Sequence, residues 1–419
     1  MHSTIGRMTS ASVFTFPDGF LWGAATAGHQ VEGDNTASDW WAYEEAGRLP
    51  FRSGAACRHF ELYERDFDLA RGLGHNAHRF SVEWSRVEPR PGRFDDDALD
   101  HYERVLDALL GRGIAPVVTL HHFVSPAWFT ERGGWLAADG PERFAAYVQR
   151  VVDRLAPKVR WWLTVNEPTV IAKHAYVIGD WPPCIKGSWG RSLRCLRGMA
   201  RGHRLAYRII HARRPDAMVS LSHSAPHVMP SNPARALDRF AVRMRDYGLN
   251  RLLFDLVGRP AGRWLDFLGI NYYSRNLVRW APHGRAVVLG EDDNAEREGE
   301  RRRFSVMGEV WPAGMTEILR SYKDFGVPLM ITENGVATDD EELRADYLKD
   351  HLHAMAEAMR EGVPVVGYLH WSLMDNYEWA LGFGPRFGLA EVDFATQERR
   401  PRAYAAIYAE TCRTGLLPA

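Results

Sequence analysis

Two glutamates stand out because each closes a short apolar run. Glu167 falls near the end of RWWLTVNEP (residues 160–168), and Glu333 near the end of PLMITENG (residues 328–335). Such runs are typical of buried parallel strands, where a carboxylate is costly for stability but well placed for chemistry. Two carboxylates from distant parts of one chain are what the cleavage of a glycosidic bond requires. Glu167 and Glu333 are therefore candidate catalytic residues.

The elements that would position these glutamates alternate regularly. Eight short apolar, β-branched or aromatic runs occur at residues 20–27, 75–82, 115–123, 160–168, 218–224, 267–273, 328–335 and 364–375. Amphipathic segments lie between them, such as 95–113 and 342–362, and the first opens with acidic residues and ends on glycine, as a capped helix does. This alternation predicts a single-domain (β/α)8 TIM barrel of the α/β class. A doubly wound open sheet is the alternative architecture.

Polar residues gather where a barrel would place an active site. They lie at or just past the C-terminal ends of the predicted strands: Gln30, Arg79, His122, Asn166, Glu167, Asn271, Tyr273, Glu333 and Trp371. In a barrel these ends converge on one face. An open sheet would not gather polar groups from all of these strands so evenly, so the barrel is favoured.

The overall composition gives few hints of a macromolecular partner. Lys and Arg number 52 and Asp and Glu number 53, so no global field favours nucleic acid or an acidic membrane surface. The fifteen tryptophans fit a carbohydrate site, since aromatic faces pack against the apolar faces of sugars, although tryptophan is also ordinary core material. The charge run at residues 291–303 is interpreted as a solvated loop near the barrel mouth, and an electrostatic docking patch is disfavoured because its two signs nearly cancel.

The cysteines and the N-terminal sequence indicate where in the cell the protein acts. Cys57, Cys184, Cys195 and Cys412 follow no metal-ligand spacing and read as reduced thiols, which favours the cytoplasm. The start of the chain lacks the apolar region of a signal peptide, and no run approaches the length of a membrane span. We expect residues 1–12 to be a loose leader and residues 13–419 to form the catalytic barrel.

Seven motifs in order carry a resemblance to glycoside hydrolase family 1, the β-glucosidase family. They are FPDGFLWGAATAGHQVEG (16–33), HRFSVEWSRVEP (78–89), TLHHF (119–123), TVNEP (164–168), GINYYS (269–274), ITENG (331–335) and WSLMDNYEWALGFGPRFGL (371–389). The resemblance covers essentially everything after residue 12. It implies a retaining β-glycosidase that hydrolyses terminal β-D-glucosyl residues, with β-D-galactosyl or β-D-fucosyl residues as further substrates, and that needs no cofactor or metal.

The resemblance also implies a role for each of the central residues. Glu167 would be the acid/base and Glu333 the nucleophile, with carboxyl groups ~5–5.5 Å apart. Arg79 would favour the charged form of Glu333, and Tyr273 would donate a hydrogen bond to it. Asn166 would hold the sugar 2-hydroxyl. Asn271 would support the same region.

The glycone pocket carries over in the same way. Gln30, His122, Glu378 and Trp379 match residues that hydrogen-bond the sugar hydroxyls, with Trp371 as the stacking floor and Phe387 at the rim. Each has a structural alternative, such as core packing for the tryptophans or a satisfied core histidine for His122. A carboxylate at Glu378 would repel phosphate, so a phosphorylated sugar is disfavoured.

The aglycone side departs from the family. Phe123 stands where many members have tryptophan, and residues 307–314 read MGEVWPAG, so that Trp311 either replaces the family's aglycone tryptophan from a shifted position or leaves it missing. The segment between Glu167 and Asn271 is short, which predicts a more open site beyond the cleaved bond.

Other functions remain as alternatives. A transglycosidase would share every catalytic residue, and a catalytically silent sugar-binding barrel would keep the pocket, although such proteins usually lose a carboxylate. A thioglucosidase typically has glutamine at the acid/base position, where this chain has Glu167. GLGHNA (72–77) precedes a predicted strand and so lacks the context of a dinucleotide site. The expected partner is a small-molecule β-glycoside, and the oligomeric state is left open.

Overall fold

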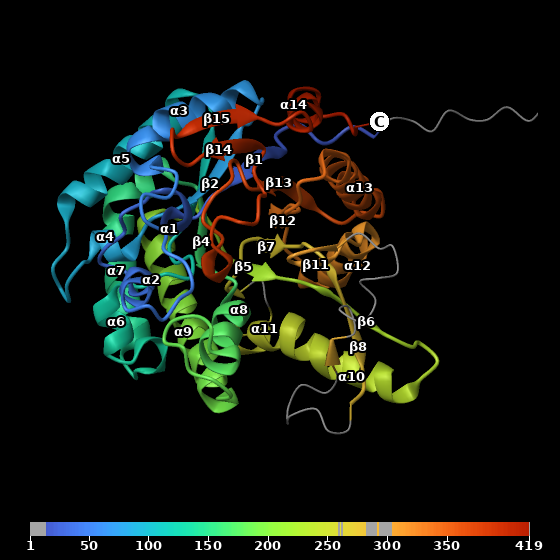
Figure 1. The fold of residues 1–419 in the computed structure, drawn as a ribbon, viewed down its shortest axis with the longest axis horizontal. Helices are drawn as coiled ribbons and strands as arrows, with labels where there is room; N and C mark the ends of the chain where they lie inside the picture. Colours follow the sequence, from blue (N-terminus) through green and yellow to red (C-terminus); the bar gives the residue numbers. More distant parts are fainter. Residues whose placement is uncertain (1–13, 259, 261–262, 282–290, 293–303, 419) are drawn as a thin grey trace, which may run out of the picture.

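The central feature is a closed barrel of eight parallel strands surrounded by helices (Figure 1). The computed structural model describes residues 14–258, 260, 263–281, 291–292 and 304–418. The barrel strands are β1 (Leu21–Ala25), β2 (Ala77–Ser81), β3 (Ala115–Thr119), β4 (Trp161–Asn166), β5 (Met218–Ser224), β7 (Leu268–Asn271), β12 (Leu329–Asn334) and β13 (Val365–Trp371). They follow sequence order around the barrel, and β13 pairs with β1 to close it. The predicted (β/α)8 barrel is confirmed, and the open sheet is excluded.

Helices cover the outside of the barrel, so the strands are buried on both faces. The longer ones are α3 (His59–Gly72), α5 (Asp96–Gly111), α7 (Gly140–Leu155), α9 (Trp189–Arg213), α10 (Ala236–Asp246), α12 (Pro312–Tyr322), α13 (Glu341–Arg360) and α14 (Ala405–Thr414). The shorter ones are α1 (Gly28–Val31), α2 (Asp39–Glu45), α4 (Trp84–Val87), α6 (Ala127–Glu131), α8 (Pro168–Lys173) and α11 (Leu252–Val257), with π-helical turns η3 (His174–Ile178) and η4 (Tyr247–Arg251). Within the described residues, 3-10 turns include η1 (Gly134–Leu136), η2 (Ala156–Lys158), η7 (Lys323–Phe325) and η8 (Trp379–Leu381).

Two predicted helices begin at aspartate caps. The side chain of Asp95 accepts hydrogen bonds from the backbone N–H groups of Asp97 and Ala98 at the start of α5. Asp340 accepts from Glu342 and Leu343 in the same way at the start of α13. These bonds satisfy N–H groups that the first turn leaves without partners. The helices expected over 95–113 and 342–362 are therefore confirmed within about two residues at each end.

The barrel interior is a packed apolar core that continues into the polar face. Val117, Leu163, Met330 and Leu369 are fully buried and belong to one cluster. The same cluster includes Trp371 at the end of β13 and several aromatic residues beyond the strand ends. Side chains at that end of the barrel thus rest on a rigid base.

The strands that carry the two glutamates lose regular pairing at their C-terminal ends. The register of β4 against β5 shifts between Leu163 and Asn166. The register of β12 against β7 shifts between Ile331 and Glu333. Such irregularities bend a strand and turn its side chains in a new direction. Here they occur just before Glu167 and at Glu333.

A second, smaller sheet lies outside the barrel and was not predicted. It contains β6 (His227–Pro230), β8 (Arg275–Arg279), β9 (Glu291–Asp292), β10 (Phe304–Ser305) and β11 (Gly308–Glu309), and β14 (Ala390–Asp393) pairs separately with β15 (Glu398–Pro401). The predicted loop over 291–303 is therefore wrong at its first two residues, because Glu291 and Asp292 pair with β8. Residues 293–303 lie outside the described part of the chain.

Two further expectations concern membrane-spanning helices and the leader over residues 1–12. Among the described residues, no helix is both long enough and apolar enough to cross a membrane. The leader expected over residues 1–12 lies outside the described residues, which begin at residue 14.

Candidate active site

Glu333, on β12, is held by two charge-stabilising donors. Arg79 Nη1 donates to Glu333 Oε1 at 2.6 Å, and the Tyr273 hydroxyl donates to Oε2 at 2.5 Å. Burial raises the pKa of Tyr273 well above its usual value, so its hydroxyl keeps its proton and acts as a donor. Each oxygen of Glu333 therefore accepts a strong hydrogen bond.

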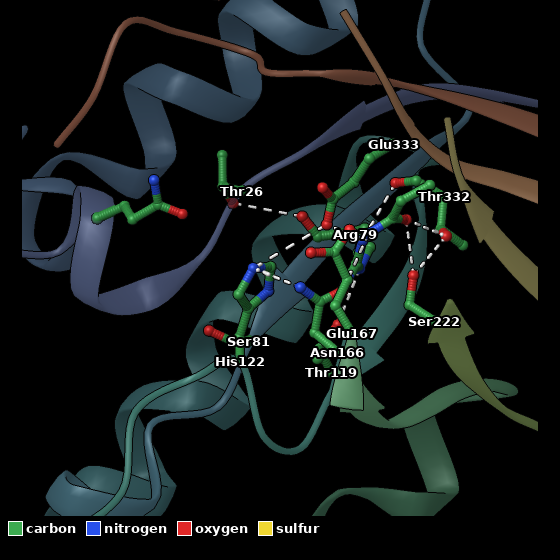
Figure 2. Close-up of polar contacts among 12 residues, drawn as sticks. Thr26, Arg79, Ser81, Thr119, His122, Asn166, Glu167, Ser222, Thr332 and Glu333 are labelled. Carbon is green, nitrogen blue, oxygen red and sulfur yellow. Dashed lines mark hydrogen bonds and ion pairs between the residues drawn. The ribbon is translucent and has the colours of Figure 1, made fainter. Parts of the chain in front are cut away.

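Arg79, in the middle of β2, is fully buried, and its side chain contacts three other strands (Figure 2). Its Nε donates to Thr119 Oγ1 at 3.0 Å on β3, and its Nη2 donates to Asn166 Oδ1 at 2.6 Å on β4. Its third partner is Glu333 on β12. A guanidinium with every direction occupied is fixed in one orientation, so the position of Glu333 is fixed with it.

The contact with Arg79 also sets the orientation of Asn166 and His122. A guanidinium cannot accept a hydrogen bond, so the oxygen of Asn166 faces Arg79 and its amide nitrogen faces away. That nitrogen lies 3.0 Å from His122 Nε2, which must accept, and the proton of the imidazole is then on Nδ1. Burial lowers the pKa of His122 well below its usual value, and the charge of Arg79 adds to this. His122 is therefore neutral.

Glu167 sits in a sharp turn between β4 and α8. Its backbone φ of 43° is in the left-handed region, which is unfavourable for a residue with a side chain and is found mostly at functional sites. Asn271 Nδ2 donates to Glu167 Oε1 at 2.8 Å. The oxygen of Asn271 accepts from Ser222 and Thr332, both at 2.7 Å, which fixes the amide in the donating orientation.

The two carboxyl groups differ in how their charge is stabilised. Burial and the neighbouring charge of Glu333 together raise the pKa of Glu167 to about 8, against the lowering effects of the Asn271 amide and the Arg79 charge. Burial also raises the pKa of Glu333, but Arg79 and Tyr273 both act to lower it. Since two like charges at such a site repel, the pair keeps one proton, and the better-stabilised charge is that on Glu333.

Gln30 and Glu378 form a second polar group. Gln30 Nε2 lies 3.2 Å from Glu378 Oε2 and 2.7 Å from the carbonyl oxygen of Tyr377. Gln30 Oε1 and His122 Nδ1 are buried and have no hydrogen-bond partner among the described residues. An acceptor and a donor left in this way are suited to hydroxyl groups of a ligand.

Aromatic residues line the same end of the barrel. Trp371, Trp379 and Phe387 are buried and belong to the cluster that fills the barrel interior. The ring of His122 is stacked at 5.9 Å from Trp371 and at 6.2 Å from Trp379. The predicted glycone residues thus lie together in one place, although they come from four segments of the chain.

Phe123 belongs to a wall of aromatic side chains, of which the sequence predicted only a part. Its ring lies 5.1 Å from that of Trp379 and 4.8 Å from that of Trp181, and the ring of His174 is stacked 4.6 Å from Trp181. Trp181 was not singled out, and its position just before Pro182 and Pro183 carried no motif. The hydroxyls of Thr119, Ser222 and Thr332 were missed as well, although Thr119 and Thr332 belong to the TLHHF and ITENG motifs and Ser222 lies inside the predicted run 218–224.

Trp311 occupies a different setting, at the start of α12. The Arg275 guanidinium lies over its ring at 3.7 Å from the centroid, and Arg275 is in turn paired with Glu309. The backbone oxygen of Trp311 accepts from the Tyr272 hydroxyl at 2.5 Å. One face of the indole is therefore covered by a cation, and only the other could meet a ligand.

No cluster of three or more His, Cys, Asp or Glu side chains suited to a metal ion occurs among the described residues. The arrangement consists of two buried carboxyl groups in different electrostatic settings, beside polar and aromatic side chains. It can carry out nucleophilic attack and proton transfer on a neutral, hydroxyl-rich molecule.

Comparison with known proteins agrees with this geometry. The sequence model described as Glycosyl hydrolase family 1 matches residues 12–264 and 261–415. Beta-glucosidase A of Thermotoga maritima is 33% identical over 93% of this chain and 95% of its own length. The solved structure of a beta-glycosidase from Pyrococcus horikoshii is 38% identical, with a TM-score of 0.91 and 97% of both chains covered. A beta-glucosidase from Thermotoga maritima in complex with castanospermine has a TM-score of 0.88 at 30% identity, covering 97% of this chain and all of its own.

Proposed function

The chain belongs to glycosyl hydrolase family 1, and we propose that Glu333 is its nucleophile and Glu167 its acid/base. Its activity is that of a retaining β-glycosidase. We propose terminal non-reducing β-D-glucosides as substrates, with β-D-galactosides and β-D-fucosides as further ones, because related chains are named beta-glucosidase and beta-galactosidase.

The reaction proceeds in two displacements. In the first, Glu333 attacks the anomeric carbon, the bond to the leaving oxygen breaks, and Glu167 gives that oxygen its proton. In the second, water attacks the same carbon, Glu167 takes a proton from the water, and the Glu333 ester bond breaks. Two inversions return the β configuration.

The observation that carries this assignment is the unequal treatment of the two carboxyls. Arg79 and Tyr273 both stabilise a negative charge on Glu333, as a nucleophile needs. Glu167, with a pKa raised to about 8 by burial and by the charge of Glu333, holds a proton at neutral pH, as a general acid needs.

Asn271 supports a separation suited to retention. Its amide donates to Glu167, and hydrogen bonding from the same side chain lowers the pKa of Glu333. One amide that acts on both carboxyls favours the spacing of about 5–5.5 Å at which the second carboxylate attacks directly, over the wider spacing of an inverting site.

We assign the glycone hydroxyls to Gln30, His122, Glu378 and Trp379, and the stacking floor to Trp371. Gln30 Oε1 and His122 Nδ1 each have one unused hydrogen-bonding position for a hydroxyl. Phe387 packs at 6.2 Å from the ring of Tyr273 and so borders the nucleophile. Asn166 keeps an amide hydrogen for the 2-hydroxyl, because its nitrogen has two and His122 takes one.

Charge repulsion by Glu378 does not explain why a phosphorylated sugar is disfavoured. Burial raises the pKa of Glu378 to about 8, so its carboxyl is protonated at neutral pH and does not repel phosphate by charge. The nearby cation gives a better reason. Arg386, which follows Glu378 in the same loop, lies 3.2 Å from Glu391 and 3.8 Å from Asp375, so its charge is already matched.

For the aglycone side we propose Phe123, with Trp181 beside it, as the wall that meets the leaving group. Trp311 is retained as a second contact through its uncovered face. We propose a cytoplasmic location because all four cysteines are unpaired in the described chain.

A screen of aryl β-glycosides that differ only at the 4-hydroxyl tests the substrate proposal. The expected result is hydrolysis of the β-glucoside with smaller or equal rates on the β-galactoside and β-fucoside. Binding of the glucoside without any turnover would instead support a silent sugar-binding barrel. Transfer to an added alcohol in preference to water would support a transglycosidase.

A further inference from the structure

The near balance of charge in the whole chain hides a strong local imbalance. Residues 189–254 contain thirteen arginines against three aspartates, and neither lysine nor glutamate. These residues include α9, α10 and most of α11, which lie along the lower part of Figure 1. This segment of an otherwise neutral protein is therefore strongly basic.

The 25-residue helix α9 carries seven arginines and no acidic residue. Arg191, Arg194, Arg197, Arg201 and Arg208 are exposed, and their spacing of mostly three or four residues aligns them in a ridge along the helix. Arg201 is paired with Glu142. Burial lowers the pKa of Arg204, and the neighbouring charges of Arg208 and Arg201 also act to lower it.

The helix α10 adds an exposed apolar row to this basic segment. Ala241 and Asp238 face inward, and Ala241 packs with Val228 and Val278 of the small sheet. Leu237, Phe240 and Met244 are 46%, 47% and 44% exposed and recur at three- and four-residue spacing, so they form one row.

Arginines flank the apolar row on α10. Arg239 and Arg243 are exposed, and Arg239 donates only to the carbonyl oxygens of Pro233 and Ala234. No carboxylate among the described residues pairs with either side chain. The outer surface of α10 thus joins unmatched cations to apolar side chains, as helices that lie on a membrane surface do.

The two helices are part of one continuous assembly. The chain runs from α10 through η4 into α11. Arg204 of α9 donates to the carbonyl oxygen of Leu256 in α11 at 2.7 Å, which ties the two together. The arginine ridge and the apolar row are therefore held at fixed positions relative to each other.

We propose that α10, assisted by the arginine ridge of α9, docks the enzyme on an anionic lipid bilayer. The arginines attract the acidic headgroups, and Leu237, Phe240 and Met244 enter the boundary between headgroups and acyl chains. A nucleic acid would use the arginines but would leave the apolar row in water. Because none of these residues belongs to the active site, docking and hydrolysis are separate properties.

Co-sedimentation with vesicles tests the proposal on the full chain. Wild-type protein binds vesicles containing phosphatidylglycerol, does not bind pure phosphatidylcholine, and is released as ionic strength rises from about 0.01 M to about 0.15 M. The double variant R239A/R243A weakens binding more than tenfold, at about fivefold per arginine. The variant L237S/F240S/M244S weakens it by about tenfold or more.

A matched control removes one cation and one exposed apolar side chain elsewhere. R104A/L110S changes exposed residues of α5 and leaves vesicle binding unchanged. All variants keep wild-type kcat/KM on a soluble aryl β-glucoside, which shows that they are folded. Equal binding by wild type and both α10 variants overturns the proposal. So does preference for a DNA duplex over vesicles, or concentration-dependent self-association that the apolar substitutions abolish.

Discussion

Arg79 and Glu333 are in direct contact in the floor of the site, with 2.6 Å between Nη1 and Oε1. The same guanidinium holds Asn166, so the nucleophile assignment and the contact to the sugar 2-hydroxyl share one support. Thr119 accepts a hydrogen bond from Arg79 Nε and so fixes the remaining side of the guanidinium. A change at any of these positions is therefore expected to move more than one catalytic contact.

The pH dependence of activity should report Glu167. Its raised pKa of about 8 means that the general acid loses its proton, and activity falls, as pH rises through that region. We expect an alkaline limb near pH 8 in kcat/KM for a substrate whose leaving group needs protonation. In Glu167→Gln, assayed with a leaving group that needs none, that limb should disappear. An unchanged limb in this variant would assign the titration to another group.

Asn271 offers a sharper form of the same test. Its hydrogen bond favours the charged form of Glu167, so Asn271→Ala should raise the pKa of Glu167 and move the alkaline limb to higher pH. Activity should fall about 10- to 100-fold at the same time, as for loss of other supporting contacts. Ser222→Ala is the control, because Thr332 still holds Asn271. A downward shift of the limb in Asn271→Ala would contradict the proposed role.

Chemical rescue separates the roles of the two glutamates. In Glu167→Ala the glycosyl-enzyme forms from an activated substrate but reacts slowly with water, because no general base remains. Azide needs no base, so it should restore turnover and yield the β-glycosyl azide. The product configuration is read by NMR, and an α-glycosyl azide would rule out the retaining mechanism.

Barrel closure should depend on Gly23 in β1. A methyl group there would lie 1.8 Å from the carbonyl oxygen of Ala77 in β2, and that backbone atom cannot move away without opening the barrel. Gly23→Ala should lower the free energy of unfolding by about 3 kcal/mol or more, or prevent folding. Gly111→Ala at the end of α5 meets no atom within 4 Å and should leave stability unchanged or slightly raised. Equal urea midpoints for the two variants would show that the β1–β2 contact is not tight.

Much of the fold followed from local patterns. Each barrel strand lies inside a predicted run, because strands buried on both faces are almost continuously apolar and end at polar residues. The small sheet could not be found in this way. β6 and β8 are short, β6 is only partly buried, and the two strands pair across more than forty intervening residues. Their pairing depends on the barrel that brings them together.

The residues of the site also divide into those that the sequence predicted and those that it did not. The motif residues around Glu167 and Glu333 were found because each side chain lies next to a strand end. Trp181 was missed, because its place beside Phe123 is set by the path of the loop after η3 and not by any spacing. The protonation of Glu378 was also missed, since the sequence carries no measure of how deeply a carboxyl is buried.

Trapping the covalent intermediate tests the central claim most directly. A 2-deoxy-2-fluoro-β-D-glucosyl donor with a good leaving group should react once and stay attached, because fluorine destabilises the oxocarbenium-like transition state of the second step. Digestion and mass spectrometry should place the sugar on the peptide that contains Glu333, and Glu333→Gly should not be labelled. A sugar found on Glu167, or turnover of normal substrates by Glu333→Gly at the wild-type rate, would contradict the account.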